Sequence, residues 1–227
     1  MSAASPEALG LDPAAAFGPE DYAAATGAGP EEMADLKAFR DLLEEWSGRM
    51  NLVGPSALAD FWRRHAFDSA QLLDLSRPEE RVWADIGAGA GFPGVVLAIR
   101  LKHQSHAGGR AMVHLIESLA KRCRFLSEAV TMLDLPAVVH NARAEDLRLT
   151  GIDIVTARAC APLPKLLGYA APLLKKRGAR GLFPKGREAE AELAEARKTW
   201  TFEASMTESR SDPSGRILSI ERLTHVR

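Results

Sequence analysis

Apolar residues recur at helical spacing in two segments between residues 31 and 80. Before them, residues 1–30 are rich in alanine, glycine and proline and show no periodicity, which predicts a flexible N-terminal tail. The helical patterns run through Leu36, Phe39, Leu42, Leu43 and Trp46, and through Leu58, Phe61, Trp62, His65, Phe67 and Leu72. Spacings of three and four residues place these side chains on one face of each helix. We therefore expect an N-terminal helical layer over residues 31–80.

From residue 81 the pattern changes to short apolar runs separated by longer helical segments. The strand-like runs are residues 81–86, 112–116, 137–140, 152–157 and 181–184, and the helical segments are residues 119–133, 164–174 and 187–198. This alternation is typical of an α/β fold with a mostly parallel sheet. Residues 200–207 and 216–224 flank a turn sequence at residues 211–215, which predicts an antiparallel C-terminal hairpin. Residues 81–227 are thus expected to form one Rossmann-like domain.

The composition agrees with an ordinary globular protein, because 46% of the 227 residues are hydrophobic and 26% are charged. Cys123 and Cys160 lie far apart and belong to no cysteine–histidine cluster, so we expect neither a disulfide framework nor a metal site. The chain begins without the pattern of a signal peptide and has no apolar run near the length of a membrane span. We expect a cytoplasmic protein that does not associate with a membrane.

The charge is distributed unevenly along the chain. Residues 1–35 hold seven acidic side chains and no lysine or arginine, so residues 36–227 carry 29 bases against 23 acids. Basic side chains in this body are candidates for phosphate contacts: Arg64, His65, Arg122, Arg124, Lys165 and Lys185. Solvated helix ends and loops have the same appearance, so each cluster alone leaves both interpretations open.

The segment 82–94, VWADIGAGAGFPG, joins a short apolar run to a glycine-rich turn with the spacing GxGxG. Asp85 stands where a strand should end, and Gly87, Gly89 and Gly91 allow the backbone to approach a ligand closely. A dinucleotide loop requires glycine at the position that Phe92 occupies, and no Walker lysine follows. The loop therefore favours S-adenosylmethionine as the cofactor and predicts a methyltransferase fold.

Ligands of doubly wound sheets bind beyond the carboxyl ends of the strands, so the residues that follow each run are candidates for the site. Glu117 ends the second run and can accept hydrogen bonds from both ribose hydroxyls of an adenosine ligand. Residues 143–146 follow the third run and could contact the adenine edge. Arg158 follows the fourth run, where an arginine needs a carboxylate, phosphate or cofactor as its partner.

Two features of the segment around Arg158 bear on the identity of the methyl acceptor. No [DN]-P-P-[YFW] tetrapeptide follows the fourth run, so methylation of an exocyclic amine loses support. Cys160 could attack a pyrimidine ring during carbon methylation, but this needs an activated thiol, and a buried structural cysteine is the simpler interpretation.

Seven motifs together resemble the RsmG family of bacterial 16S rRNA guanine-N7 methyltransferases, also called glucose-inhibited division protein B (GidB). They are Asn51-Leu52-Val53, Arg64-His65-Ala66-Phe67-Asp68-Ser69, residues 85–94, Lys121-Arg122-Cys123-Arg124-Phe125-Leu126, Arg143-Ala144-Glu145-Asp146, Ala157-Arg158-Ala159 and Pro184-Lys185-Gly186. The resemblance covers roughly residues 36–225, in the order and spacing of the family. Phe92 and Cys160 depart from it, since many relatives have leucine and an aromatic residue there.

The resemblance implies methyl transfer from S-adenosylmethionine to N7 of one guanine in the decoding-region loop of 16S rRNA. It also implies cofactor contacts by Gly87, Phe92, Ala144, Glu145 and Arg158, to which the residue patterns above add Asp85, Gly89, Gly91 and Glu117. Guanine N7 carries a lone pair and no proton, so we expect no catalytic acid or base. The partner would be 16S rRNA or the small ribosomal subunit, and the protein a monomer.

Two other functions stay open from the sequence. One is a methyltransferase for a protein or a small molecule, which predicts an apolar substrate pocket and no benefit from the basic clusters. The other is a module that binds cofactor or RNA without turnover. The roles of His65 and Asp68, three residues apart in a helical pattern, are also open between a place at the cofactor pocket and a structural contact.

Overall fold

The computed structural model describes residues 15–54, 58–104, 111–175 and 178–226. Its centre is a seven-stranded sheet with the order β3-β2-β1-β4-β5-β7-β6. The strands are β1 Val82–Ile86, β2 Met112–Glu117, β3 Ala137–Asn141, β4 Ile154–Thr156, β5 Arg180–Lys185, β6 Trp200–Glu208 and β7 Arg216–His225. Strands β1 to β5 pair in parallel, whereas β7 runs antiparallel to both β5 and β6. The predicted parallel sheet and C-terminal hairpin are confirmed.

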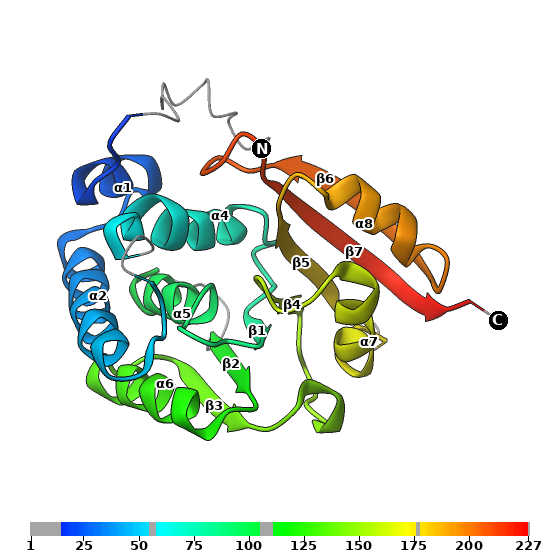
Figure 1. The fold of residues 1–227 in the computed structure, drawn as a ribbon, viewed down its shortest axis with the longest axis horizontal. Helices are drawn as coiled ribbons and strands as arrows, with labels where there is room; N and C mark the ends of the chain where they lie inside the picture. The colour runs from blue at the N-terminus through cyan, green and yellow to red at the C-terminus, as the bar shows by residue number, and fades with distance from the viewer. Residues whose placement is uncertain (1–14, 55–57, 105–110, 176–177, 227) are drawn as a thin grey trace.

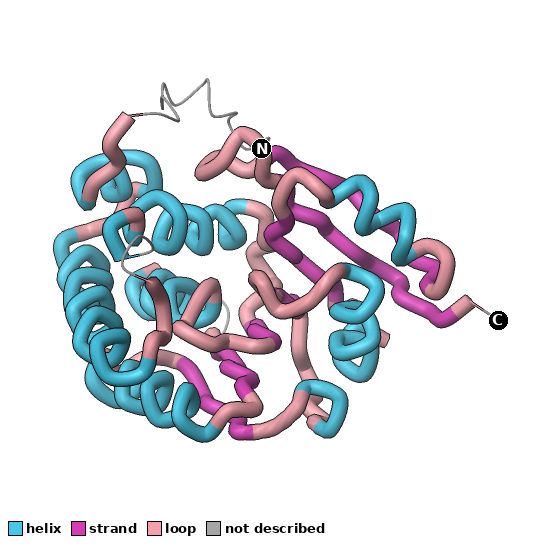
Figure 2. The backbone as a smooth tube through the Cα atoms, in the orientation of Figure 1, coloured by secondary structure: helices cyan, strands magenta, loops and turns pink. Residues whose placement is uncertain are grey.

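Helices cover both faces of the sheet (Figures 1 and 2). They are α1 Pro19–Thr26, α2 Pro30–Met50, α4 Asp68–Asp74, α5 Gly94–His103, α6 Ala120–Met132, α7 Leu163–Leu174 and α8 Ala189–Ala196, with a π-helical turn η2 Phe61–Phe67 and a 3-10 turn η3 Ala144–Asp146. The N-terminal helices, α5 and α6 build one hydrophobic core, and α7 and α8 build the other. None of the described helices is long and apolar enough to cross a membrane.

Side chains of adjacent strand residues enter opposite cores, as the two-residue period of a strand requires. On β2, Leu115 belongs to the core under α5, and Ile116 belongs to the core under α7. The same strand pairs with β1 through Asp85 and Leu115 and through Ile86 and Ile116, so the two carboxyl ends finish level with each other. This register places Glu117, the last residue of β2, beside the glycine loop that follows β1.

The N-terminal prediction needs correction between residues 19 and 30. A flexible tail was expected over residues 1–30, but Pro19–Thr26 form helix α1 and Tyr22 is fully buried. Arg100 of α5 donates hydrogen bonds to the Tyr22 hydroxyl at 3.3 Å and to Glu32 at 3.0 Å. The helix is thus fixed to α5 by a buried polar contact that an alanine-rich sequence cannot reveal. Residues 1–14 lie outside the described residues.

Deletion of residues 1–28 is therefore expected to destabilise the protein. The deletion removes Tyr22 from the core and exposes the buried Arg100–Glu32 pair, which should lower the free energy of unfolding by about 3 kcal/mol or more. Urea denaturation of this variant beside a variant that lacks only residues 1–14 isolates the contribution of α1. Equal stability of the two variants would contradict the prediction.

Candidate active site

The glycine loop leaves β1 and turns sharply before α5. Gly87, Gly89 and Gly91 have φ angles of 71°, 53° and 87°, which residues other than glycine rarely adopt. A Cβ atom at Gly87 would lie 3.0 Å from the sulfur of Cys160, and one at Gly91 would lie 2.7 Å from Val95 Cγ2. The amides of Gly87 and Ala88 donate to the carbonyl of Ile116 on β2, at 2.8 and 3.0 Å. The loop is consequently packed against Cys160 and Val95 and hydrogen-bonded to β2.

Asp85, next to the last residue of β1, is fully buried behind this loop. Its Oδ2 atom accepts a hydrogen bond from the Gly94 amide at 2.9 Å, and its Oδ1 atom has no partner among the described residues. Burial raises the pKa of Asp85 to about 7, with opposing contributions from the Gly94 amide and from Arg158 that lower it and a further rise from Glu117. A buried oxygen without a partner is costly, so it indicates a polar ligand at this position.

Glu117 ends β2 and stabilises the glycine loop from the neighbouring strand. Its Oε2 atom accepts a hydrogen bond from the Gly89 amide at 3.1 Å, and its Oε1 atom accepts one from the Leu119 amide at 2.8 Å. The Arg122 guanidinium lies 3.7 Å from the same carboxylate. A carboxylate has about four lone-pair positions, so two amide contacts leave capacity for ribose hydroxyls.

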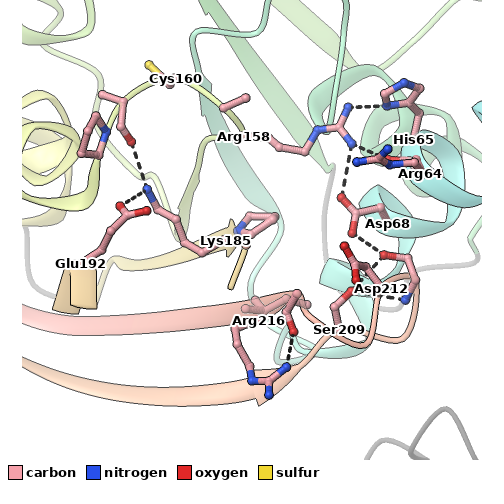
Figure 3. Close-up of a pocket in the computed structure, with 18 residues that line it drawn as sticks. Arg64, His65, Asp68, Arg158, Cys160, Lys185, Glu192, Ser209, Asp212 and Arg216 are labelled. Atoms are coloured by element: carbon pink, nitrogen blue, oxygen red, sulfur yellow. Dashed lines mark hydrogen bonds and ion pairs between the residues drawn. The ribbon is translucent and has the colours of Figure 1, made fainter. Parts of the chain in front are cut away.

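Arg158, which follows β4, joins the sheet to the N-terminal helices (Figure 3). Its Nη1 atom donates to the Arg64 carbonyl at 2.6 Å and to Asp68 Oδ2 at 3.2 Å, and its Nη2 atom donates to His65 Nδ1 at 2.7 Å. The guanidinium carbon lies 5.1 Å from the centre of the Phe92 ring, on which the His65 ring stacks at 4.5 Å. Arg158 thereby fixes the glycine-loop residue Phe92 relative to η2 and α4.

His65 is neutral in this arrangement. Burial, together with the charges of Arg158 and Arg64, lowers its pKa to about 4. Because Arg158 donates to Nδ1, the ring proton resides on Nε2. The Nε2 atom is buried without a partner among the described residues. The contacts of His65 and Asp68 thus show them to be the groups that orient Arg158.

A cavity of about 840 Å³ opens between the segment after β4, the end of β5 and the turn between β6 and β7 (Figure 3). It is lined by Arg64, His65, Asp68, Arg158, Ala159, Cys160, Ala161, Pro162, Pro184, Lys185, Gly186, Glu192, Ser209, Ser211, Asp212, Gly215, Arg216 and Ile217. Its volume is in the range of small-molecule sites. The cavity includes no residue of the glycine loop, but Cys160 lies in its wall and faces Gly87.

Cys160 is exposed, so the expectation of a buried structural cysteine is wrong. The residue before it, Ala159, has a φ of 52°, which turns the chain sharply between Arg158 and the cavity. Partial burial raises the pKa of the Cys160 thiol, and the carboxylates of Asp85 and Glu117 raise it further. A thiol that stays protonated is a poor nucleophile, which disfavours covalent attack on a pyrimidine ring.

The predicted cofactor residues meet at one edge of the sheet. Asp85 and Glu117 lie at the carboxyl ends of β1 and β2, the glycine loop and Arg158 follow β1 and β4, and Ala144 and Glu145 lie in η3 after β3. Among the predicted substrate residues, Arg64, His65 and Lys185 line the cavity, and Arg122 lies beside Glu117. Arg124 and Lys165 are exposed outside the cavity lining.

Lys185 is less available than its sequence context indicates. Its ammonium donates to Glu192 at 2.8 Å and to the Ala161 carbonyl at 3.0 Å, and its side chain is only 9% exposed. By contrast, the Arg64 side chain is 70% exposed. Arg64 is therefore the better candidate for a phosphate contact at the mouth of the cavity.

Several residues at the site gave no usable signal in the sequence. Ser209, Ser211 and Arg216 line the cavity from the turn between β6 and β7 and from the first residue of β7, more than a hundred residues along the chain from Arg64 and His65. Leu119 could have been found, because it is an apolar residue directly after the strand that ends in Glu117. It is 55% exposed, which places an apolar surface beside the carboxylate.

Comparison with known proteins identifies the family. The GidB family model, described as rRNA small subunit methyltransferase G, matches residues 32–215. A Caulobacter vibrioides protein named Ribosomal RNA small subunit methyltransferase G is 56% identical over 96% of this chain and 98% of its own length. A protein of the same name from Paramagnetospirillum magneticum is 42% identical over 93% of this chain and 98% of its own length.

Solved structures agree in fold at much lower sequence identity. An S-adenosylmethionine-dependent methyltransferase from Aquifex aeolicus is 16% identical, with a TM-score of 0.52 over 80% of this chain and 97% of that structure. Magnesium protoporphyrin IX methyltransferase from Synechocystis PCC 6803, solved with bound cofactor, is 14% identical, with a TM-score of 0.52 over 83% and 97%. The expected methyltransferase fold is confirmed, and the chain belongs to the GidB family of rRNA small subunit methyltransferases G.

Proposed function

We propose that this protein transfers a methyl group from S-adenosylmethionine to N7 of a specific guanine in the decoding-region loop of 16S rRNA. Membership of the rRNA small subunit methyltransferase G family supports the reaction and the class of substrate. The observation that supports a cofactor and an RNA acceptor meeting at one site is the position of Cys160. This residue lies between the glycine loop and a cavity with cationic side chains in its wall. We infer that the protein acts as a monomer in the cytoplasm, on 16S rRNA or the small ribosomal subunit.

The residues at the carboxyl edge of the sheet fit S-adenosylmethionine. The buried Asp85 Oδ1 atom lacks a partner among the described residues, and the cofactor carries an ammonium group that could supply one. Glu117 has lone pairs free for ribose hydroxyls, and a side chain at Gly87 would contact Cys160 and narrow the space in front of the loop. When bound there, S-adenosylmethionine supplies an electrophilic methyl group on a sulfonium.

The side chains around the cavity suit an acceptor that needs no proton removed. Guanine N7 has a free lone pair, so in-line attack on a methyl group requires position rather than a general base. His65 is neutral and its Nδ1 atom already accepts from Arg158, and the Cys160 thiol has a raised pKa. His65 and Cys160 are therefore poorly suited to act as a base or as a nucleophile, and they contribute to the walls around the reactants.

The basic side chains around the cavity favour a nucleic acid over an apolar acceptor. Arg64 and Arg216 line the cavity, and Arg122 lies beside the glycine loop. Such cations neutralise phosphates and raise affinity for RNA at low salt. A small apolar substrate or a protein side chain would gain nothing from them.

The direct experiment is methyl transfer from labelled S-adenosylmethionine to small ribosomal subunits purified from a strain that lacks this protein. We expect one labelled nucleotide in 16S rRNA, a 7-methylguanine in the decoding-region loop. Naked 16S rRNA, offered in parallel, tests which form is the substrate. Cofactor binding without labelled rRNA would overturn the proposal and favour a protein or small-molecule acceptor.

Glu117→Ala is expected to weaken cofactor binding by about 10- to 100-fold, because it removes a buried charged acceptor worth about 1.5 to 3 kcal/mol. Part of this loss comes from the Gly89 amide, which loses its partner. Isothermal titration calorimetry with S-adenosylmethionine measures the effect. Glu128→Ala, on an exposed position of α6, serves as the control. Unchanged affinity of Glu117→Ala would remove this residue from the cofactor site.

A further inference from the structure

One wall of the cavity belongs to the turn between β6 and β7, residues 209–215, here called the hairpin turn. It projects from the end of a two-stranded ribbon at the edge of the sheet (Figure 1). Its backbone is closed by the Ser209 amide, which donates to the Gly215 carbonyl at 3.1 Å. Ser209 and Ser211 are only 4% and 8% exposed, so their hydroxyls need partners inside the protein.

The two hydroxyls lie 2.9 Å from each other, and Gln71 of α4 supplies a further partner for both. It is 2% exposed, and its Nε2 atom lies 3.0 Å from Ser209 Oγ and 3.4 Å from Ser211 Oγ. Its Oε1 atom accepts a hydrogen bond from the Arg210 amide at 2.8 Å. A single side chain therefore binds both the backbone and the hydroxyls of the hairpin turn. Gln71 itself is not among the residues that line the cavity.

Asp68 connects this contact to the other side of the cavity. Its Oδ1 atom accepts from Ser211 Oγ at 2.6 Å and from Gln71 Nε2 at 3.0 Å, while its Oδ2 atom accepts from Arg158. Loss of the Gln71 amide would leave the Asp68–Arg158 pair in place. The hairpin turn would then lose its Gln71 contacts but keep the Ser211–Asp68 hydrogen bond and the Arg210–Asp74 ion pair, while Arg158 keeps its own contacts.

We propose that Gln71 is a positioning residue for the methyl acceptor, because it fixes the hairpin turn as a wall of the acceptor cavity. This inference rests on the proposed function, in which the cavity receives the guanine. Gln71 touches neither the cavity nor the glycine loop, so its effect passes through Ser209, Arg210 and Ser211. It therefore governs binding of the acceptor and leaves the cofactor and the chemical step unchanged.

Gln71→Glu tests this with almost no change of volume. The new carboxylate has no amide protons to donate to the two serine hydroxyls, and its charge lies at hydrogen-bond distance from the Asp68 carboxylate, so the contact between α4 and the hairpin turn is weakened. We expect the KM for small ribosomal subunits to rise at least tenfold, with kcat and the Kd for S-adenosylmethionine within twofold of the unaltered protein. A higher KM with an unchanged kcat is expected when the acceptor binds more weakly by the same amount in the ground state and in the transition state.

The matched control is Glu32→Gln, the reverse exchange in a second buried polar network. Glu32 is 5% exposed and pairs with Arg100 between α2 and α5. This variant should lower the melting temperature without a change in KM, whereas a KM shift of similar size in both variants would reduce Gln71 to a structural role. Assays are run well below the lower melting temperature.

Ser211 provides a second variant that removes only a hydroxyl. Ser211→Ala should raise KM severalfold, and Ser211→Thr should restore it. Combined with Gln71→Glu, the alanine variant should add less than its own effect, because both changes release the same turn. Multiplicative effects on KM, or a change in kcat or in cofactor affinity instead of KM, would overturn the proposal.

The same assays separate this inference from the proposed function. If the unaltered protein labels no rRNA, the proposed function fails. If the unaltered protein labels rRNA and Gln71→Glu has the normal KM, only the inference about Gln71 fails.

Discussion

Asp85→Asn should make the cofactor-free protein more stable at pH 8 and bind S-adenosylmethionine at least tenfold more weakly. The folded-state pKa of Asp85 is raised to about 7 from an ordinary value of 3.8, chiefly by burial. Between these values the unfolded chain is ionised while the folded protein holds the proton. The stability contributed by the protonated carboxyl is therefore complete below about pH 4 and is lost as the pH rises to about 7.

The asparagine variant does not titrate, so its advantage should grow over this pH range and stay constant above it. The full effect of the shift is up to about 4 kcal/mol, and the unpaired amide of asparagine offsets part of it, which leaves about 1 to 3 kcal/mol at pH 8. Urea unfolding from pH 4 to 9 and calorimetry with the cofactor measure the two effects. Asp134→Asn, at an exposed position after α6, is the control. Parallel stability profiles for Asp85→Asn and the unaltered protein would contradict the raised pKa.

The gain in stability and the loss of binding have one cause. A carboxyl group buried without a second partner costs folding free energy, and residues selected for ligand binding commonly retain such a cost. The Oδ1 atom of Asp85 is unpartnered among the described residues although the Gly94 amide satisfies Oδ2. A neutral amide removes the cost and also removes the negative charge that would attract an ammonium.

Much of the sheet could be predicted from the sequence because its strands are short apolar runs bounded by turns. The run at residues 152–157 became β4, Ile154–Thr156, and the run at residues 181–184 became β5, Arg180–Lys185. The helical layer was also predicted, since an amphipathic pattern depends only on local spacing. Helix α1 was not, because its single buried Tyr22 produces no periodicity.

The site was predictable only as far as topology dictates it. Residues at or just after the carboxyl ends of parallel strands lie along one edge of the sheet, and this rule predicts the positions of Asp85 on β1, Glu117 on β2 and Arg158 after β4. Polar contacts between distant segments follow no such rule. The sequence could not show that Glu192 neutralises Lys185, and it left the partner of Arg158 open between a carboxylate, a phosphate and the cofactor.

Arg158→Ala should reduce methyl transfer at least a hundredfold and also lower the free energy of unfolding by about 2 to 4 kcal/mol. The variant leaves Asp68 Oδ2, His65 Nδ1 and the Arg64 carbonyl without their donor, and the Phe92 ring loses the cation above it. Arg158→Lys keeps the charge but cannot donate to three acceptors in these directions, so we expect intermediate activity. Denaturation and single-turnover labelling of small subunits give the two quantities.

Arg180 provides the control that separates the loss of methyl-transfer rate from the loss of stability. Like Arg158, it is a largely buried arginine that donates to a carboxylate and a backbone carbonyl, but it does not line the cavity. It donates to Glu80 at 2.6 and 2.7 Å and to the Leu75 carbonyl at 2.6 Å, and its side chain is 7% exposed. Arg180→Ala should destabilise the protein at least as much as Arg158→Ala while the folded fraction keeps its normal rate. Equal loss of rate in both variants would mean that Arg158 acts through stability alone. A rate loss specific to Arg158→Ala would place its guanidinium at the junction where the cofactor loop, the helical layer and the acceptor cavity meet.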